Sequence, residues 1–203
     1  MPRYAAIVTM WLASASLAEE PQSSVAITLE QPPASYVALG SLLVELEATT
    51  LPDLVETLGI GVLRHNGRRS HDGGGDEVCF SYGGGVIRFT SNSEMGGSKR
   101  SVTDFLVEAT TTSPVDCSIL PERFSSVRVG GWLNIGDSRT TVERHFESTA
   151  GRGNARILYE FSGTTPGNCA NIDLRAFDIS TSLEIAYRSN SVVRIKGSRL
   201  TTC

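Results

Sequence analysis

The chain has 203 residues, with 18 Lys and Arg against 22 Asp and Glu, and its formal net charge is −4. Nucleic-acid binding requires clustered basic side chains, whereas Lys is nearly absent here and Arg is dispersed, so the composition argues against a nucleic-acid partner. No apolar run reaches the roughly 20 residues that cross a bilayer, so we expect no membrane span.

The first 18 residues have the pattern of a cleaved secretory signal. A short basic start at residues 1–3 precedes a mostly apolar stretch at 4–12, and small residues follow. Ser16 and Ala18 lie at positions −3 and −1 relative to the cleavage site before Glu19, where small side chains are favoured. We therefore expect residues 1–18 to be a signal peptide cleaved at Ala18/Glu19, and the mature chain to be periplasmic or secreted.

The segment after this signal begins with an arm and leads into a helix. Residues 19–35 are rich in Pro, Ser, Gln and Glu and are expected to form a flexible arm or an edge strand. Residues 37–47 are expected to form a strand or a short helix, and their apolar alternation favours the strand. Residues 50–59 predict a short helix, because Thr50 can accept a hydrogen bond from a first-turn amide and Gly59 is a natural stop.

The middle of the chain predicts antiparallel strands separated by polar or glycine-rich segments. The strands are expected at residues 77–82, 85–90 and 102–108. The loops and irregular segments are expected at residues 64–76, 91–98 and 110–121. The run Gly83-Gly84-Gly85 joins the first two strands and indicates a hairpin.

The second half of the chain repeats this order of elements. It predicts a helix at residues 139–148 and a Gly/Pro turn region at 162–168. Its strands are expected at residues 156–161, 172–179, 183–187 and 192–196. We therefore expect an α+β fold of two similar units, residues 36–125 and 126–203, each with a short helix or helix pair packed on an antiparallel sheet.

The four cysteines indicate two disulfides in an exported chain, for which three connectivities are possible. None lies in a CxxC pair, which argues against a zinc or thioredoxin-type site, and we expect no metal. Each half holds two cysteines at similar separations, 38 and 34 positions, so each unit can close its own bridge. We therefore predict the pairs Cys79–Cys117 and Cys169–Cys203.

The start of the second helix resembles a known family. The run Leu133-Asn134-Ile135-Gly136-Asp137-Ser138, followed by Val142, resembles the helix start of small secreted α+β modules, which include the β-lactamase inhibitor protein and the outer-membrane assembly lipoprotein of the BamE/SmpA type. The resemblance covers residues 130–165, and Tyr159 falls where those modules carry a strand Tyr. It implies a helix pair against a curved antiparallel sheet used to bind proteins. It does not imply β-lactamase as the target, and no lipid-anchor cysteine follows residues 1–18.

Five residues are candidate contacts with a partner. The loop after the 85–90 strand carries Asn92, Glu94 and Met95, which place polar groups, a carboxylate and a flexible thioether at the edge of a rigid sheet. Trp132 is an aromatic residue of the kind that anchors interfaces or fills a core. Tyr159 belongs to a strand expected to offer adaptable contacts.

Two other functions stay open at this point. His65, His71 and Asp72 lie in the glycine-rich loop, so a hydrolase or a metal-dependent enzyme with a dispersed site is one alternative. A small-ligand carrier is the other, and it needs an apolar cavity of about 300 Å³ or more. The third histidine, His145, is expected on a solvated helix face.

The function predicted from the sequence is non-enzymatic binding outside the cytoplasm. The chain has no GxSxG elbow and no phosphate-loop ending, so neither hydrolase nor nucleotide chemistry has a motif to support it. We expect a protein without a cofactor that recognises another extracytoplasmic protein, as an inhibitor or an assembly factor does. The oligomeric state is left open.

Overall fold

The computed structural model describes residues 24–66, 75–92, 99–111, 114–148, 154–166 and 176–202, and the predicted signal peptide, residues 1–18, lies outside them. The helices are α1 (Leu51–Leu58), the 3-10 helix η1 (Glu122–Phe124) and α2 (Arg139–His145). The strands are β1 (Ser24–Thr28), β2 (Tyr36–Leu39), β3 (Leu42–Glu45), β4 (Arg64–Asn66), β5 (Gly75–Tyr82), β6 (Gly85–Asn92), β7 (Asp104–Glu108), β8 (Ser118–Ile119), β9 (Val127–Val129), β10 (Arg156–Pro166), β11 (Ala176–Arg188) and β12 (Ser191–Thr202).

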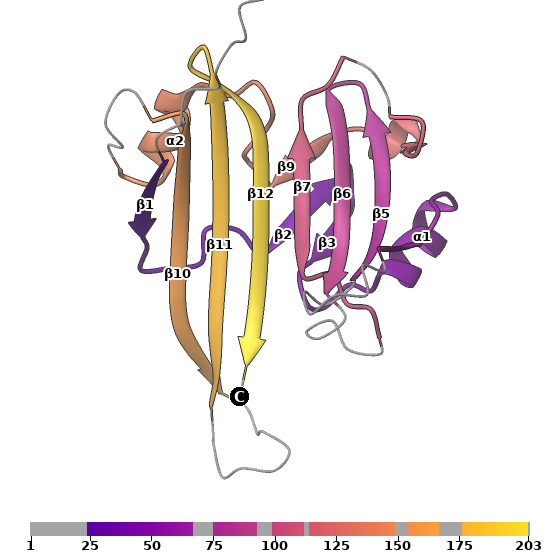
Figure 1. The fold of residues 1–203 in the computed structure, drawn as a ribbon, viewed down its shortest axis with the longest axis horizontal. Helices are drawn as coiled ribbons and strands as arrows, with labels where there is room; N and C mark the ends of the chain where they lie inside the picture. Colours follow the sequence, from indigo (N-terminus) through magenta and orange to yellow (C-terminus); the bar gives the residue numbers. More distant parts are fainter. Residues whose placement is uncertain are drawn as a thin grey trace, which may run out of the picture.

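The strands form two sheets (Figure 1). The larger one has the order β1-β10-β11-β12-β7-β6-β5-β4, with β8 paired to β5, and the smaller one has the order β3-β2-β9. Only β1–β10 and β5–β8 are parallel pairs among the described strands. Figure 1 shows α2 and β1 on one side of the molecule, next to β10, and α1 on the other side, next to β5.

A single hydrophobic core joins the two sheets and both α-helices. Its largest fully buried side chains include Phe80, Phe89 and Phe105 from the first half of the sequence and Tyr159 from the second. Strands of the two halves also pair directly, β7 with β12 and β2 with β9. The α+β class is therefore confirmed, whereas the division into two similar units is not.

Helix α1 confirms the local prediction for residues 50–59. Thr50 has extended backbone angles, and its side chain accepts a hydrogen bond from the amide of Asp53 at 3.2 Å, which satisfies one free donor of the first turn. Gly59 ends the helix in the left-handed conformation, with φ 67°. Leu51, Leu54 and Leu58 share the buried face.

Several strand boundaries differ from the sequence prediction. Residues 37–47 form the hairpin β2–β3 rather than one strand, because Gly40 turns the chain at φ 59°. Residues 64–66 form β4 inside the predicted loop. The predicted turn at 162–168 is β10 as far as Pro166, and the two strands predicted at 172–179 and 183–187 are one strand, β11.

The long strands continue through Ser- and Thr-rich sequence that lacks an apolar signal. Ser182 and Ser198 share a hydrogen bond of 2.7 Å between β11 and β12. Thr181 of β11 is only 1% exposed, and its hydroxyl has no hydrogen-bond partner within the described residues. Because Ser and Thr hydroxyls pair across a sheet, hydrophobic periodicity alone misses these extensions. Helix α2 ends at His145, three residues before the predicted end.

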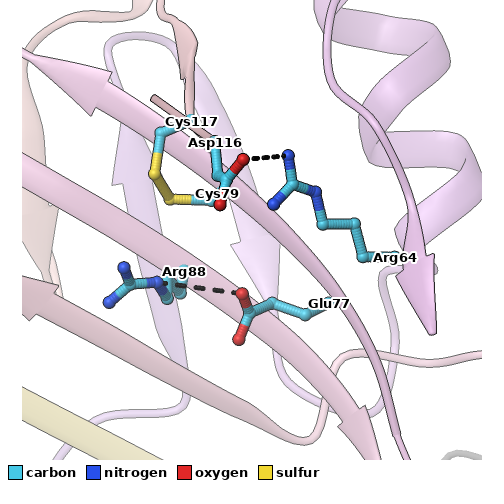
Figure 2. A network of polar contacts seen from close by, with 6 residues as sticks. All are labelled: Arg64, Glu77, Cys79, Arg88, Asp116 and Cys117. Carbon is cyan, nitrogen blue, oxygen red and sulfur yellow. Dashed lines mark hydrogen bonds and ion pairs between the residues drawn. A yellow bond between two sulfur atoms is a disulfide. The ribbon is translucent and has the colours of Figure 1, made fainter. Parts of the chain in front are cut away.

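The predicted disulfide Cys79–Cys117 is confirmed (Figure 2). It joins β5 to the segment that leads into β8, with the two Cα atoms 4.6 Å apart. The same neighbourhood holds the ion pair of Arg64 and Asp116, at 3.0 Å, and that of Glu77 and Arg88, at 3.7 Å. The guanidinium of Arg64 lowers the pKa of Asp116, chiefly through their hydrogen bond.

The second predicted disulfide, Cys169–Cys203, lies outside the described residues. The strands that flank it end close together, because Thr202 pairs with Asp178 and Ala176 pairs with Pro166. The ends of β10 and β12 therefore lie at the same end of the large sheet. The pairing stays a prediction, and peptide mapping under non-reducing conditions tests it.

Glu47 connects the two sheets in a way that the sequence does not reveal. It follows β3 with φ 65°, an uncommon conformation for a residue with a side chain. Its carboxylate accepts three hydrogen bonds from β12, from Arg199 Nε at 3.0 Å, the Thr201 amide at 2.7 Å and Thr201 Oγ1 at 2.6 Å. These bonds hold the end of the small sheet against the far part of β12.

Removal of this carboxylate should destabilise the fold. We expect Glu47→Ala to lower the free energy of unfolding by about 2–3 kcal/mol, because it leaves partly buried donors without their charged acceptor. Glu47→Gly removes the same acceptors but relieves the positive φ, so its loss should be smaller by about 1 kcal/mol. Urea unfolding followed by circular dichroism measures both, and a Glu47→Ala protein as stable as the parent would contradict this role.

Candidate functional site

A tight turn between β9 and α2 places Trp132 against the helix. The amides and carbonyls of Val129 and Leu133 exchange hydrogen bonds of 2.9 and 3.0 Å, which closes the turn. Gly130 and Gly131 have φ 59° and 78°, which side chains disfavour, so glycine is required for this reversal. Leu133 enters the core, with 0% exposure, while Trp132 stays partly exposed beside α2.

The residues that carry the family resemblance anchor the start of α2. The Asp137 carboxylate accepts a hydrogen bond from the Asn134 amide at 2.7 Å, and the Gly136 amide donates to the Val192 carbonyl at 2.8 Å. Ser138 caps the helix by accepting a hydrogen bond from the Thr141 amide at 3.2 Å. This segment therefore fixes α2 on the hairpin between β11 and β12.

An aromatic cluster extends from the core to the surface beside α2. The His145 imidazole stacks on Trp132 with ring centroids 3.6 Å apart, and Phe146 meets both rings edge to face at 5.1 and 5.7 Å. Phe146 in turn stacks on Tyr159 at 4.0 Å. Tyr159 is 0% exposed, so it supports the cluster from below rather than contacting a partner.

A groove opens beside this cluster. It has a volume of about 600 Å³ and lies between the segment that continues β1 and the end of α2. The groove is lined by Thr28, Leu29, Glu30, Gln31, Pro32, Pro33, His145, Phe146 and Glu147. It thus combines a proline-containing wall, an aromatic wall and two exposed carboxylates, Glu30 and Glu147.

Desolvation shifts the pKa values of the ring groups in and near the aromatic wall in the direction of their uncharged forms. Desolvation lowers the pKa of His145, and it raises the pKa of Tyr159 and of Tyr187. The Arg139 guanidinium lies 4.5 Å from the centroid of the Tyr187 ring and donates a hydrogen bond to the carbonyl of Asn154. It therefore links α2 to the start of β10 and the end of β11. The charged side chains in the groove lining are the two exposed carboxylates, Glu30 and Glu147.

The five predicted contact residues do not come together. Trp132 and Tyr159 meet in the aromatic cluster through His145 and Phe146. Asn92 ends β6 at the end of the large sheet that is opposite to α2. Through their common neighbour β7, the start of β6 is in register with Arg194 of β12, and β6 then runs towards the register of Ser198. Helix α2 is fixed beside Ser191, at the other end of β12. Glu94 and Met95 lie outside the described residues.

The alternative site around His65 has a different setting from the one expected. His65 lies on β4, where its Nδ1 is 3.0 Å from Asp76 Oδ1, and Asp76 also pairs with Arg100 at 2.7 Å. His71 and Asp72 fall outside the described residues. Within the part of the chain that is described, no group of three or more His, Cys, Asp and Glu is arranged to hold a metal ion.

Sequence reasoning missed the contribution of His145 and of the arm. His145, expected on a solvated helix face, is exposed at one side and stacked on Trp132 at the other. In the sequence, the local indication that His145 belongs to an aromatic cluster is that Phe146 follows it directly. The opposite wall, residues 28–33, is more than 100 positions away in sequence, so no spacing indicates that the two segments meet.

The lowered pKa of His145 makes stability depend on pH. Well above pH 6.5, the pKa of the free side chain, His145 is neutral in both the folded and the unfolded chain. As the pH falls below that value, the unfolded chain binds the proton more readily, and the free energy of unfolding declines until the pH is below the folded pKa. We expect His145→Gln to lose less stability than the parent between about pH 7 and pH 5. Urea midpoints at both pH values measure this, and an equal decline in the two proteins would contradict it.

Neither a membrane-spanning helix in the described part of the chain nor a match to known proteins identifies the class of this protein. Among the described residues, no helix is both long enough and apolar enough to cross a membrane. No known protein family, curated protein or solved structure matches the chain.

Proposed function

We propose that this chain is an exported, non-enzymatic binding protein that recognises another extracytoplasmic protein in the groove between the arm and α2. The observation that carries the proposal is the groove itself, which sets exposed carboxylates beside a preformed aromatic wall. The resemblance of residues 133–142 to protein-binding α+β modules supports the same interpretation. Because one fold can serve many functions, the proposal rests on the chemistry of the groove.

The lining of the groove defines the partner's chemistry. Pro32 and Pro33 stiffen one wall, and Trp132 and Phe146 hold the His145 ring on the other, so little conformational entropy is lost on binding. Glu30 and Glu147 supply negative charge in a chain whose net charge is already −4. The groove therefore fits an extended segment in which a basic side chain lies next to an apolar or aromatic one.

Displayed peptides test this proposal, because the groove then selects its own ligand from many sequences. A random peptide library is selected on the parent protein, and the recovered peptides are tested for binding to the double variant Glu30→Gln/Glu147→Gln. The control is Glu56→Gln/Glu122→Gln, which makes the same change in charge at two exposed residues outside the groove. We expect peptides rich in Lys or Arg beside apolar residues, with about tenfold weaker binding to the groove variant at low salt.

Two outcomes would contradict this site. Equal binding by the groove variant and the control would show that the peptides use another surface. Peptides without basic residues would show that charge complementarity is not the basis of recognition. A small molecule that displaces the peptides while lacking a basic group would instead favour the carrier alternative.

Export is a separate part of the proposal with its own measurement. The pattern of residues 1–18 and the Cys79–Cys117 bridge both support an oxidising compartment. N-terminal sequencing of the chain recovered outside the cytoplasm should begin at Glu19. A recovered chain that keeps Met1 would contradict cleavage at Ala18/Glu19.

A further inference from the structure

Strand β1 presents an uncharged edge at the side of the large sheet. It pairs with β10 on one side and is first in the strand order, and no described strand pairs with its other side. Its five residues, Ser24 to Thr28, include neither a charge nor a proline, the features that commonly protect edge strands. The opposite edge strand, β4, is only three residues long. It carries Arg64, which pairs with Asp116, and His65, whose Nδ1 lies 3.0 Å from Asp76 Oδ1.

The hydrogen-bond pattern shows which groups of β1 point outward. The Leu29 amide donates to the Glu160 carbonyl at 2.7 Å, and Ile27 is in register with Tyr159. In a parallel pair, alternate residues bond to the partner strand, so Val25, Ile27 and Leu29 face β10. The amides and carbonyls of Ser24, Ala26 and Thr28 therefore point away from the sheet.

We propose that β1 is a homodimerisation edge, on which β1 of a second copy of this chain pairs antiparallel about a two-fold axis at Ala26. This register places Ala26 opposite itself and Ser24 opposite Thr28, so that every outward amide meets an outward carbonyl. Three residues in each copy donate one bond each, which gives six hydrogen bonds. A single-residue slip would place the outward groups opposite residues whose own groups are already bonded to β10.

The side chains of β1 are self-complementary in the same register. Val25 lies opposite Ile27 of the second copy, which pairs two β-branched apolar side chains on the face that packs towards the core. Ser24 and Thr28 bring hydroxyl groups together on the exposed face, and Ala26 adds no steric conflict. The two copies would then share one continuous sheet through their β1 strands. A five-residue strand pair is small compared with the 1,200–2,000 Å² of a typical stable interface, so we expect a dissociation constant of about 1–100 μM.

Charge variants at Ala26 test this edge directly, because the residue meets its own copy. Ala26→Lys and Ala26→Glu are each expected to weaken self-association at least tenfold, since like charges lie opposite each other in the pair. An equimolar mixture of the two variants should recover a heterodimer. Sedimentation velocity over about 1–100 μM measures all three samples, and circular dichroism confirms that each variant is folded.

A backbone variant and a control complete the experiment. Ala26→Pro removes an outward amide but none of the amides that bond to β10, so it should abolish the dimer and leave the monomer folded. Leu43→Lys, on the exposed edge strand β3 of the small sheet, should leave the dimer unchanged. A parent chain that is monomeric at about 100 μM, or a dimer that responds to Leu43→Lys and not to the Ala26 variants, would overturn the proposal. Self-association is measured without peptide, so these results are distinct from peptide binding, although Thr28 belongs both to the edge and to the groove lining.

Discussion

Replacement of Cys79 and Cys117 together by serine is expected to lower the free energy of unfolding by about 3–4 kcal/mol. The bridge joins residues 38 positions apart, and its loss releases a large loop in the unfolded chain. It also frees the segment that carries β8, whose pairing with β5 is limited to Ser118 and Ile119. Urea unfolding of the oxidised parent and of the double variant measures the difference.

Two comparisons separate the bridge from its surroundings. Reduction of the parent with dithiothreitol should lower its unfolding midpoint towards that of the double variant. Arg64→Gln breaks the ion pair with Asp116 next to the bridge (Figure 2). The two side chains are 42% and 71% exposed, so the midpoint should change little, because solvent screens exposed charges. A double serine variant as stable as the oxidised parent would contradict a stabilising role for the bridge.

Features set by short sequence segments could be predicted. The cap at Thr50, the stop at Gly59 and the hairpin between β5 and β6 each depend on residues within a few positions of one another. The Cys79–Cys117 pair was also predicted, from the similar cysteine separations in the two halves. The two-unit description is not confirmed, and β7 of the first half pairs with β12 of the second in one sheet.

Features set by distant contacts could not be predicted. The φ of 65° at Glu47 is maintained by bonds to Arg199 and Thr201, which are more than 150 positions away. The groove likewise forms only when β1 adds to β10 and brings residues 28–33 beside α2. Tyr159 was identified as a notable residue from its place in the resemblance, but only the fold shows that it is buried beneath Phe146.

Tyr159 is expected to give the largest loss of stability at the candidate site. Its ring is fully buried and stacks on Phe146, so Tyr159→Ala leaves a cavity under the aromatic wall and should cost about 3–5 kcal/mol. Tyr159→Phe keeps the ring and removes only the hydroxyl, whose contact with Ser148 Oγ is long at 3.3 Å, so its cost should be about 1 kcal/mol or less. Urea unfolding of both variants gives the two values.

The same pair of variants tests whether the groove depends on its support. Trp132 reports on the wall because it stacks on His145, and its fluorescence spectrum should shift towards that of exposed Trp in Tyr159→Ala but not in Tyr159→Phe. Binding of the selected peptides should follow the same order, since Phe146 and His145 line the groove above Tyr159. Binding is compared at a temperature where Tyr159→Ala is fully folded. If Tyr159→Ala then binds those peptides as tightly as Tyr159→Phe, the ring that supports the aromatic wall is not needed for binding. The aromatic wall would in that case not be the recognition surface.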